Sequence, residues 1–252
     1  MSNFFEYFPR TLYKFGEETT DDVIQNIAIY ADVVDQIKDT RSTYIDYTII
    51  ENERPDQVSF KLYRTPDYHW TFYLLNDKLR EQGWPVTRDA VLAKAKKDYP
   101  NTTLTTRSNL GAVKGYFKTG DTISGRTSGA TAKIIHRRLD FGQLIVQMTS
   151  SESFTAGELV EMTGTTDLIT LTSVQLEYNS AHHYEDADKF VTDLGFDSAD
   201  AGGVLLAPGA QLTEITFLDR LHNQNDNLKQ IRVLKPDVAK QVVDAFREAV
   251  SS

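Results

Sequence analysis

The sequence contains no cysteine, which excludes disulfide bonds, a thiol nucleophile and cysteine-ligated zinc or iron–sulfur clusters. No apolar run approaches the roughly 20 residues that span a bilayer. The first residues, MSNFFE, lack the basic start and the apolar stretch of a secretory signal peptide. Basic residues are outnumbered, because 27 Lys and Arg stand against 36 Asp and Glu, and the net charge is −9. We therefore expect an acidic, soluble protein made inside the cell, with no membrane and no nucleic acid among its partners.

What is present is the composition of a folded chain: 252 residues, 40% hydrophobic and 25% charged, enough for one large or two modest domains. Its parts differ. Of the 27 Phe, Tyr and Trp residues, 17 lie in residues 1–106. The segment 107–178 has no proline and is rich in Thr, Ser and Gly, which is typical of short strands joined by turns. We expect an α+β, multi-domain protein: a helical N-terminal domain with a small strand pair (1–106), an inserted small β-barrel (107–178), and a helical C-terminal segment that completes the first domain (179–252).

The chain opens with an aromatic arm. Burying a large apolar side chain contributes about 1.5–3 kcal/mol, so a cluster of them at a terminus has to be covered. Two alternatives stand: the arm pairs beside residues 44–50 of its own domain, or it is an interface buried by a neighbouring chain. The arm residues are Phe4, Phe5, Tyr7, Phe8, Leu12, Tyr13 and Phe15.

Periodicity and capping residues predict the elements that follow. Thr20 is a candidate N-cap for a helix with one apolar face (Val23, Ile27, Tyr30, Val34 and Ile37). Residues 44–50 alternate as a strand does. Proline followed by Asp favours helix starts at Pro55 and Pro66, which gives helices over 55–63 and 68–79, and a basic amphipathic helix is expected over 87–99.

Near the C-terminus we expect two helices. One covers 223–234. The other begins at Pro236, with an inward face made of Val238, Val242, Ala245 and Phe246.

The middle segment contains an internal repeat. The pattern F-x-x-G-[DE]-x-[IV] occurs at 117–123 and again at 154–160, a shift of 37 residues. Gly120 and Gly157 are expected to supply a positive φ in equivalent turns. Two strand–turn–strand units predict a closed or nearly closed barrel of about six strands, in which Phe117 superposes on Phe154.

The sequence offers single candidate residues for a hydrolytic site, but no set of them forms a catalytic motif. Four acidic residues offer paired carboxylates, but they lie at turns and helix starts, where acids are common anyway: Glu51, Glu53, Asp56 and Asp67. Ser124 and Ser128 lie in turns and not in a nucleophile elbow. The neighbouring glycines lack the Lys and Ser/Thr of a phosphate loop.

A metal site is the other candidate. His182 and His183 stand beside Glu185, and His222 is far along the chain. Adjacent histidines in a strand point to opposite faces, so they rarely share one metal ion. We expect no catalytic residue, no cofactor and no metal, and hence a protein that is not an enzyme and has no small-molecule substrate.

Taken in order, the motifs of the first segment resemble the baseplate wedge protein 53 family of T-even-type, contractile-tailed phages. R-P-D, K-L-Y, P-D-Y-x-W, N and W-P follow one another over about 40 residues, and one departure is Arg64, where Gly is expected. The matching residues are Arg54, Pro55, Asp56, Leu62, Tyr63, Pro66, Asp67, Tyr68, Trp70, Asn76, Trp84 and Pro85. Residues 182–185 and 225–236 are similar more loosely, and the β-insert matches no motif of that family.

The resemblance implies a non-catalytic structural subunit, one copy per wedge, that bridges neighbouring wedges of the tail baseplate. Its implied partners are other wedge subunits, with the central hub or tube as further candidates. It implies a place in the virion tail after assembly in the host cytoplasm. A tail-associated cell-wall hydrolase and a carbohydrate-binding module remain as alternative functions.

Overall fold

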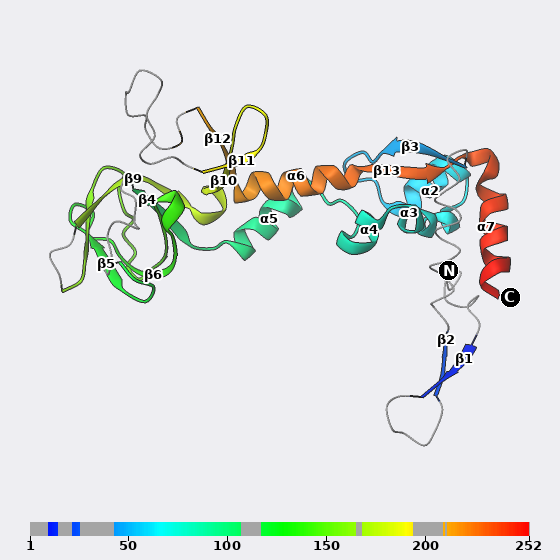
Figure 1. Ribbon diagram of the computed structural model, residues 1–252, viewed down its shortest axis with the longest axis horizontal. Coiled ribbons are helices and arrows are strands. Elements are labelled where there is room, and N and C mark those ends of the chain that lie inside the picture. The colour runs from blue at the N-terminus through cyan, green and yellow to red at the C-terminus, as the bar shows by residue number, and fades with distance from the viewer. Residues whose placement is uncertain are drawn as a thin grey trace. The chain divides into compact units, whose positions relative to one another are not determined.

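The computed structural model describes residues 10–14, 22–25, 43–106, 117–164, 168–193, 209 and 211–251. It is a mixed helix and strand structure that divides into two compact units, Met1–Thr87 with Gln224–Ser252, and Arg88–Asn223 (Figure 1). The boundaries expected at 107 and 178 do not coincide with this division, because 88–106 and 179–223 belong to the barrel unit. Among the residues that the structure describes, no helix is both long and apolar enough to cross a membrane.

The first unit is organised around two strands from opposite ends of the sequence. β3 (Tyr44–Thr48) pairs antiparallel with β13 (Gln230–Leu234). The helix expected over 223–234 is therefore wrong in its second half, since α6 (Phe217–Lys229) ends where β13 begins. The reason is visible in the sequence: buried Ile231 and Val233 alternate with exposed Gln230 and Arg232, a period of two that suits a strand.

Short helices pack on this strand pair. They are α2 (Pro55–Tyr63), the 3-10 helix η3 (Pro66–Tyr68), α3 (Trp70–Leu75) and α4 (Asp77–Gln82). The helix start at Pro55 is confirmed, whereas Pro66 begins only the three-residue 3-10 helix η3 and the α-helix α3 starts at Trp70. The single helix expected over 68–79 is wrong, because Asn76 is extended (φ −126°, ψ 100°) and separates α3 from α4.

α7 (Pro236–Ser251) begins where the sequence predicts. Its buried residues are Ala239, Val243 and Phe246, spaced four and three apart as one helical stripe. The expected inward position of Ala245 is wrong, since Ala245 is exposed. The unit's two buried clusters consist of Ile49, Val58, Phe72, Leu79, Leu228, Ile231 and Val233, and of Leu74, Leu75, Leu234, Ala239 and Phe246.

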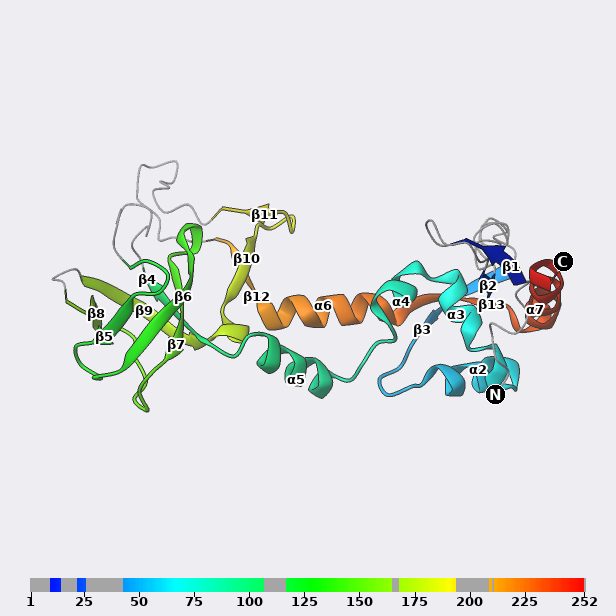
Figure 2. The same ribbon diagram turned by 90° about the horizontal axis from the view of Figure 1, so that it is seen from below.

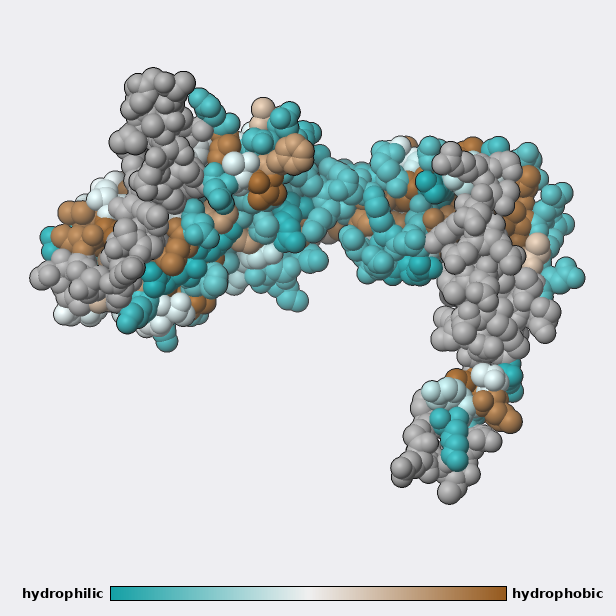
Figure 3. Space-filling model, viewed as in Figure 1, coloured by the Kyte–Doolittle hydropathy of each residue, from teal (hydrophilic) through white to brown (hydrophobic). Residues whose placement is uncertain are grey.

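β1 (Arg10–Tyr13) pairs antiparallel with β2 (Asp22–Gln25). The helix expected from Thr20 is wrong over 22–25, where Val23 lies in β2; Ile27, Tyr30, Val34 and Ile37 lie outside the described residues. The described part of the arm does not pair with β3. Leu12 and Tyr13 are 66% and 51% exposed, and Figure 3 shows hydrophobic surface on this strand pair.

The second unit contains a closed six-stranded barrel, as the sequence predicts. Its strands are β4 (Thr102–Thr106), β5 (Thr122–Gly125), β6 (Thr131–Arg138), β7 (Gln143–Met148), β8 (Leu159–Met162) and β9 (Leu168–Leu176). Their order around the barrel is β4-β7-β6-β5-β8-β9 (Figure 2). β4 precedes the expected domain boundary at 107, so the barrel is longer than the segment 107–178.

The repeat gives the barrel an internal two-fold relation. Gly120 N donates to the Ile134 carbonyl (2.8 Å), and Gly157 N donates to the Leu171 carbonyl (2.9 Å), again 37 residues on. Both glycines have positive φ, 98° and 87°, as expected. β6 pairs with β7, and β9 pairs with β4. β4 therefore has the same position relative to the second copy of the repeat as β7 has relative to the first.

The unit also contains elements that are not strands of the barrel. α5 (Arg88–Asp98) leads into β4, and the 3-10 helices η4 (Leu139–Phe141) and η5 (Glu177–Asn179) follow β6 and β9. β10 (Ala181–Glu185) pairs with β11 (Val191–Thr192) on one side and with β12 (Thr213–Thr216) on the other. The barrel core consists mainly of Leu104, Phe117, Ile123, Ile134, Leu144, Val146, Phe154, Val160, Ile169 and Leu171.

Candidate functional site

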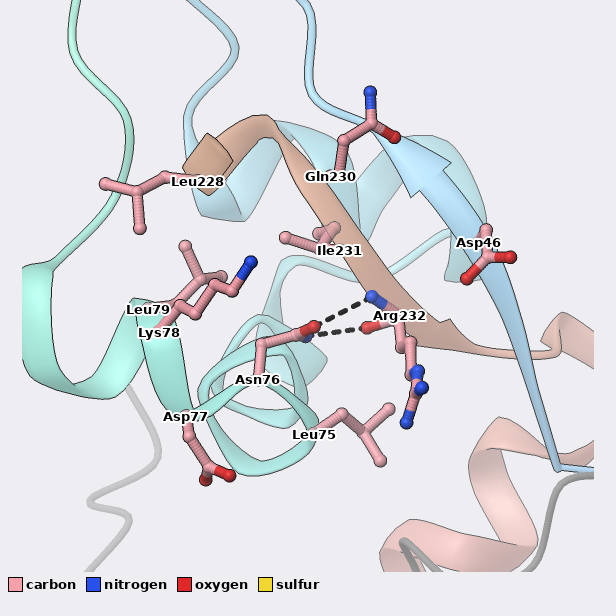
Figure 4. A pocket seen from close by; sticks show the side chains of 10 residues that line it. All are labelled: Asp46, Leu75, Asn76, Asp77, Lys78, Leu79, Leu228, Gln230, Ile231 and Arg232. Carbon is pink, nitrogen blue, oxygen red and sulfur yellow. Dashed lines mark hydrogen bonds between the residues drawn. The ribbon is translucent and has the colours of Figure 1, made fainter. Parts of the chain in front are cut away.

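The motif residues of the first unit meet the C-terminal stretch 225–236 through two asparagines. Asn76, at the break between α3 and α4, accepts from Arg232 N and donates to the Arg232 carbonyl, both at 2.8 Å (Figure 4). Its amide also donates to the Phe72 carbonyl at 2.8 Å. Asn76 thus provides hydrogen-bond partners for the backbone N–H and carbonyl of Arg232 in β13, as a neighbouring strand would.

Asn225 makes the matching contact on α6. Val86 N donates to Asn225 Oδ1 (2.8 Å), and Asn225 Nδ2 donates to the Val86 carbonyl (2.9 Å). The Asn225 residue is 7% exposed, so its amide has little access to water. We call the two contacts the asparagine clips. In each clip an asparagine side chain binds the backbone of a distant residue: Arg232 is 156 residues from Asn76, and Val86 is 139 residues from Asn225.

Trp84 and Tyr63 hold the same junction from the motif side. Trp84 Nε1 donates to the Glu53 carbonyl (2.7 Å), and its ring lies against Phe72, with centroids 5.9 Å apart. The Tyr63 hydroxyl donates to the Leu234 carbonyl at the end of β13 (3.1 Å). Burial, only partly offset by its hydrogen bonds, raises the pKa of Tyr63 above its ordinary value, so the hydroxyl stays a donor.

The remaining motif residues begin and cover the helices. Pro55 occupies the first turn of α2, Asp56 pairs with Arg54 (3.1 Å), and Asp67 N donates to Thr65 Oγ1 (3.3 Å) at the start of η3. Trp70 is half-buried and lies on Phe246, with ring centroids 4.9 Å apart. The half-buried Leu62 and Tyr68 pack against the two buried clusters.

Arg64 occupies the position where the sequence pattern leads us to expect Gly. It follows α2 in the left-handed conformation (φ 61°, ψ 17°), and its N–H donates to the Phe60 carbonyl at 3.0 Å. Side chains with a Cβ pay for this conformation, whereas Gly adopts it freely. The departure from the pattern therefore falls at a place where the backbone favours Gly.

The acidic candidates of a hydrolytic site serve local structure. Glu53 accepts from Tyr47 Oη (2.9 Å), Ile50 N (2.9 Å) and Lys61 Nζ (3.0 Å). Burial acts to raise the pKa of Glu53, but the bonds from Ile50, Lys61 and Tyr47 outweigh it and hold that pKa below its ordinary value. A general acid needs a raised pKa, so Glu53 is poorly suited to that role. Glu51 is exposed in the same turn.

The histidine candidates differ from expectation. A bulge between Ala181 and His183 in β10 brings the two rings together, with His182 Nδ1 and His183 Nδ1 2.9 Å apart, so the expectation that they point to opposite faces is wrong. His183 Nε2 lies 3.1 Å from Glu185 Oε1. Burial first, then the charges of Arg220, His183 and Arg138, lower the pKa of His182 to about 4. Within the described ranges, no group of three His, Asp or Glu residues is arranged to hold a metal ion.

Ser128 supports a loop in the barrel. Its Oγ donates to Glu158 (3.0 Å), whose carboxylate also accepts from Thr155 N (2.6 Å), Ser128 N (3.0 Å) and Thr127 N (3.2 Å). Burial opposes these bonds, yet together they keep the pKa of Glu158 below its ordinary value. A Cβ at Gly125 would overlap Ser128 and Glu158, so this loop closes tightly on the second copy of the repeat. Ser124 lies on β5.

A pocket of about 470 Å³ opens beside the first clip (Figure 4). We call it the β13 pocket. It is lined by apolar and charged side chains: Asp46, Leu75, Asn76, Asp77, Lys78, Leu79, Leu228, Gln230, Ile231 and Arg232. Its walls come from two separate stretches of the sequence, residues 46–79 and residues 228–232.

The sequence did not reveal β13 or the Asn225 clip, although Asn225 was part of the looser C-terminal similarity. The alternation of Gln230–Leu234 was the available signal for the strand. Of the arm residues, Leu12 and Tyr13 are described and exposed; Phe4, Phe5, Tyr7, Phe8 and Phe15 lie outside the described residues. No protein-family model matches the chain, and no curated protein is significantly similar to it in sequence.

Proposed function

We propose that the protein is a structural subunit of a phage tail baseplate, akin to the wedge protein 53 family, which joins neighbouring wedges during baseplate assembly. In this proposal it carries no catalytic residue, cofactor or small-molecule substrate. Its partners are other wedge subunits, and the hub or tube are further candidates. Its place is the virion tail, reached after assembly in the host cytoplasm.

The observation that carries the proposal is the convergence of the two separated motif stretches on one junction. Asn76, Trp84 and Tyr63 direct their polar groups to the backbone of distant segments. Asn225 does the same from the C-terminal side. Motif residues used in this way specify a joint between chain segments, a role that suits a building block.

The described end of the arm supports the assembly role. Leu12, Tyr13 and Val23 are 66%, 51% and 60% exposed on the β1–β2 pair. Adjacent exposed apolar side chains of this kind are typical of a surface that a partner covers. The proposal assigns that partner to a neighbouring baseplate chain.

The test uses the phage that encodes the chain. An amber mutation in its gene is expected to yield lysates in which negative-stain electron microscopy finds wedges but no hexagonal plates. The wild-type chain supplied from a plasmid restores plates. The chain lacking residues 1–15 does not, although its tryptophan fluorescence shows that the first unit is still folded. Normal plates without the chain, or its absence from purified virions by mass spectrometry, would contradict the proposal.

A zymogram separates this function from that of a cell-wall hydrolase. The purified chain is expected to leave a peptidoglycan gel opaque under conditions in which lysozyme clears it. A cleared zone that disappears in Glu53→Gln would assign the function to hydrolysis instead.

A further inference from the structure

The strand β3 has one edge with unpaired backbone groups. Ile49 N donates to the Lys229 carbonyl (2.9 Å), so the hydrogen-bonded pairs of the β3–β13 ladder are those of the odd-numbered β3 residues. The backbone N–H and carbonyl groups of Tyr44, Asp46 and Thr48 therefore point away from β13. None of these groups has a hydrogen-bond partner among the residues that the structure describes.

The opposite edge of this two-stranded sheet is closed by side chains. Asn76 binds both outward backbone groups of Arg232, and the Tyr63 hydroxyl donates to the Leu234 carbonyl. In Figure 4 Asn76 and β3 lie on opposite sides of β13. The protein thus protects the edge along β13 and leaves the edge along β3 available. An unprotected edge strand is a template for pairing with another chain.

The inner face of β3 is also incompletely covered. Ile45 pairs directly with Val233, and paired side chains lie on the same face of a sheet. Val233 is fully buried in a cluster with Val58 and Phe72, whereas Ile45 is 40% exposed. The difference arises because β3 is the last strand of its sheet. A strand added beyond β3 would place its own inner side chains beside Ile45.

We propose that β3 accepts an extended segment of a partner protein as a third strand of this sheet, with a basic residue opposite Asp46 and apolar residues opposite Ile45 and Tyr47. Main-chain hydrogen bonds to the outward groups of β3 would supply affinity, and the alternating side chains would supply specificity. The inference goes beyond the baseplate function and does not depend on it.

The charge of Asp46 selects the kind of strand. Asp46 is exposed and makes no ion pair within the described part of the chain; Arg232, opposite it in the ladder, lies over the Tyr44 ring, 4.9 Å from its centroid. Opposite charges directly across a strand pair are stabilising, and like charges are destabilising. A second copy of β3 therefore fits poorly, because antiparallel pairing with full overlap places Asp46 opposite Asp46 of that copy.

The test uses a peptide designed from this register, acetyl-Gly-Thr-Val-Lys-Val-Thr-Gly-amide. Antiparallel pairing places its Lys opposite Asp46 and its two Val residues opposite Ile45 and Tyr47. The peptide is titrated to about 1 mM, a concentration that detects weak binding, into the isotope-labelled full chain. We expect saturable shifts of the amide NMR signals, with the largest shifts at Tyr44, Asp46 and Thr48.

Two controls remove the backbone contacts alone. The same peptide, N-methylated at Lys and at both Thr residues, keeps its side chains but cannot donate to the outward carbonyls, and we expect no shifts. Thr48→Pro removes one outward N–H and leaves the ladder to β13 intact, as proline at the solvent side of an edge strand does. This variant should lose peptide binding with an unchanged urea midpoint in tryptophan fluorescence.

A charge exchange keeps the test informative if Thr48→Pro fails to fold. Asp46→Lys should weaken binding of the Lys peptide about fivefold, and a peptide with Glu in place of Lys should recover it. Shifts at β3 no larger than elsewhere, or equal shifts with the N-methylated peptide, would overturn the inference. So would a concentration-dependent dimer of the wild-type chain that Thr48→Pro abolishes, because a second copy would then occupy the edge.

Discussion

The two units of the protein reach stability by opposite routes. The barrel closes through pairings between strands of one continuous stretch, and its two repeat copies have equivalent hydrogen bonds at Gly120 and Gly157. The first unit combines residues before Thr87 with residues after Gln224, joined by the β3–β13 ladder and the asparagine clips. The comparison teaches that the barrel is specified by repetition, whereas the junction is specified by single side chains that reach a distant backbone.

The largest expected effect separates the two units directly. Phe72 is fully buried at the centre of the first unit, in contact with Trp84 and Tyr63. Phe72→Ala should lower the free energy of unfolding of that unit by about 3–5 kcal/mol, because it removes burial and leaves a cavity. Both tryptophans, Trp70 and Trp84, lie in this unit. Tryptophan fluorescence during urea unfolding therefore measures the loss.

The matched control lies in the barrel. Leu104 and Leu144 face each other across the β4–β7 pair and are both fully buried. Replacing either with Ala should cost about 2–5 kcal/mol, equally for the two because they are equivalent under the two-fold relation. The loss should appear in the far-ultraviolet circular dichroism of the barrel and not in tryptophan fluorescence. A shift of both signals by either variant would show that the units unfold as one.

A smaller effect tests whether the clips define the junction. Asn225→Ala leaves the N–H and carbonyl of Val86 without their partners, which should cost about 1–3 kcal/mol in urea unfolding followed by tryptophan fluorescence. Asn225→Asp keeps an acceptor for Val86 N but loses the donor to the Val86 carbonyl, so it too should lower the free energy of unfolding. Asn227→Ala, exposed on the same helix, is the control and should change little. If Asn225→Ala matches Asn227→Ala, the clip does not hold the junction.

Acid should weaken the second unit more than the first. The pKa of His182 is about 4 in the folded protein and 6.5 ordinarily, so between these values the unfolded chain binds the proton more readily. Stability contributed by neutral His182 is present above pH 6.5 and is lost as the pH falls towards 4. Facing groups are Arg138, Arg220 and His183. Partial exposure of His182 limits the effect, and His182→Gln should flatten the pH dependence of barrel unfolding measured by circular dichroism.

The smallest expected effect is a gain. Arg64→Gly relieves the left-handed backbone after α2 and should stabilise the first unit by a few tenths to about 1 kcal/mol. Arg64→Ala retains the Cβ and should bring no gain. A lower urea midpoint for Arg64→Gly than for Arg64→Ala would contradict this explanation of the sequence departure.

The parts that the sequence predicted are those where the signal is local. Proline-initiated helix starts at Pro55, Pro66 and Pro236 and the repeat turns follow from a few adjacent residues. The strand β13 was missed because it has only five residues and directly follows a helix, so the helical pattern could be extended through it in spite of its alternation. Its partner strand, residues 44–48, lies far away in the sequence. The asparagine clips could not be predicted for the same reason, because the residues that they join are far apart in the sequence. An Asn that ends one helix looks like any other until its distant backbone partner is known.

The way the chain enters and leaves the barrel sets its response to mechanical force. Glu177 N donates to the Asn101 carbonyl (2.8 Å), and Asn101 Nδ2 donates to the Glu177 carboxylate (2.8 Å), just outside the paired residues Thr102 and Leu176. Tension along the chain therefore pulls at two adjacent points and loads the β4–β9 ladder one hydrogen-bonded pair at a time. Strands loaded in this zipper geometry separate at low force, whereas strands sheared along their length resist together. The barrel is therefore expected to open first at this pair and to lengthen under load.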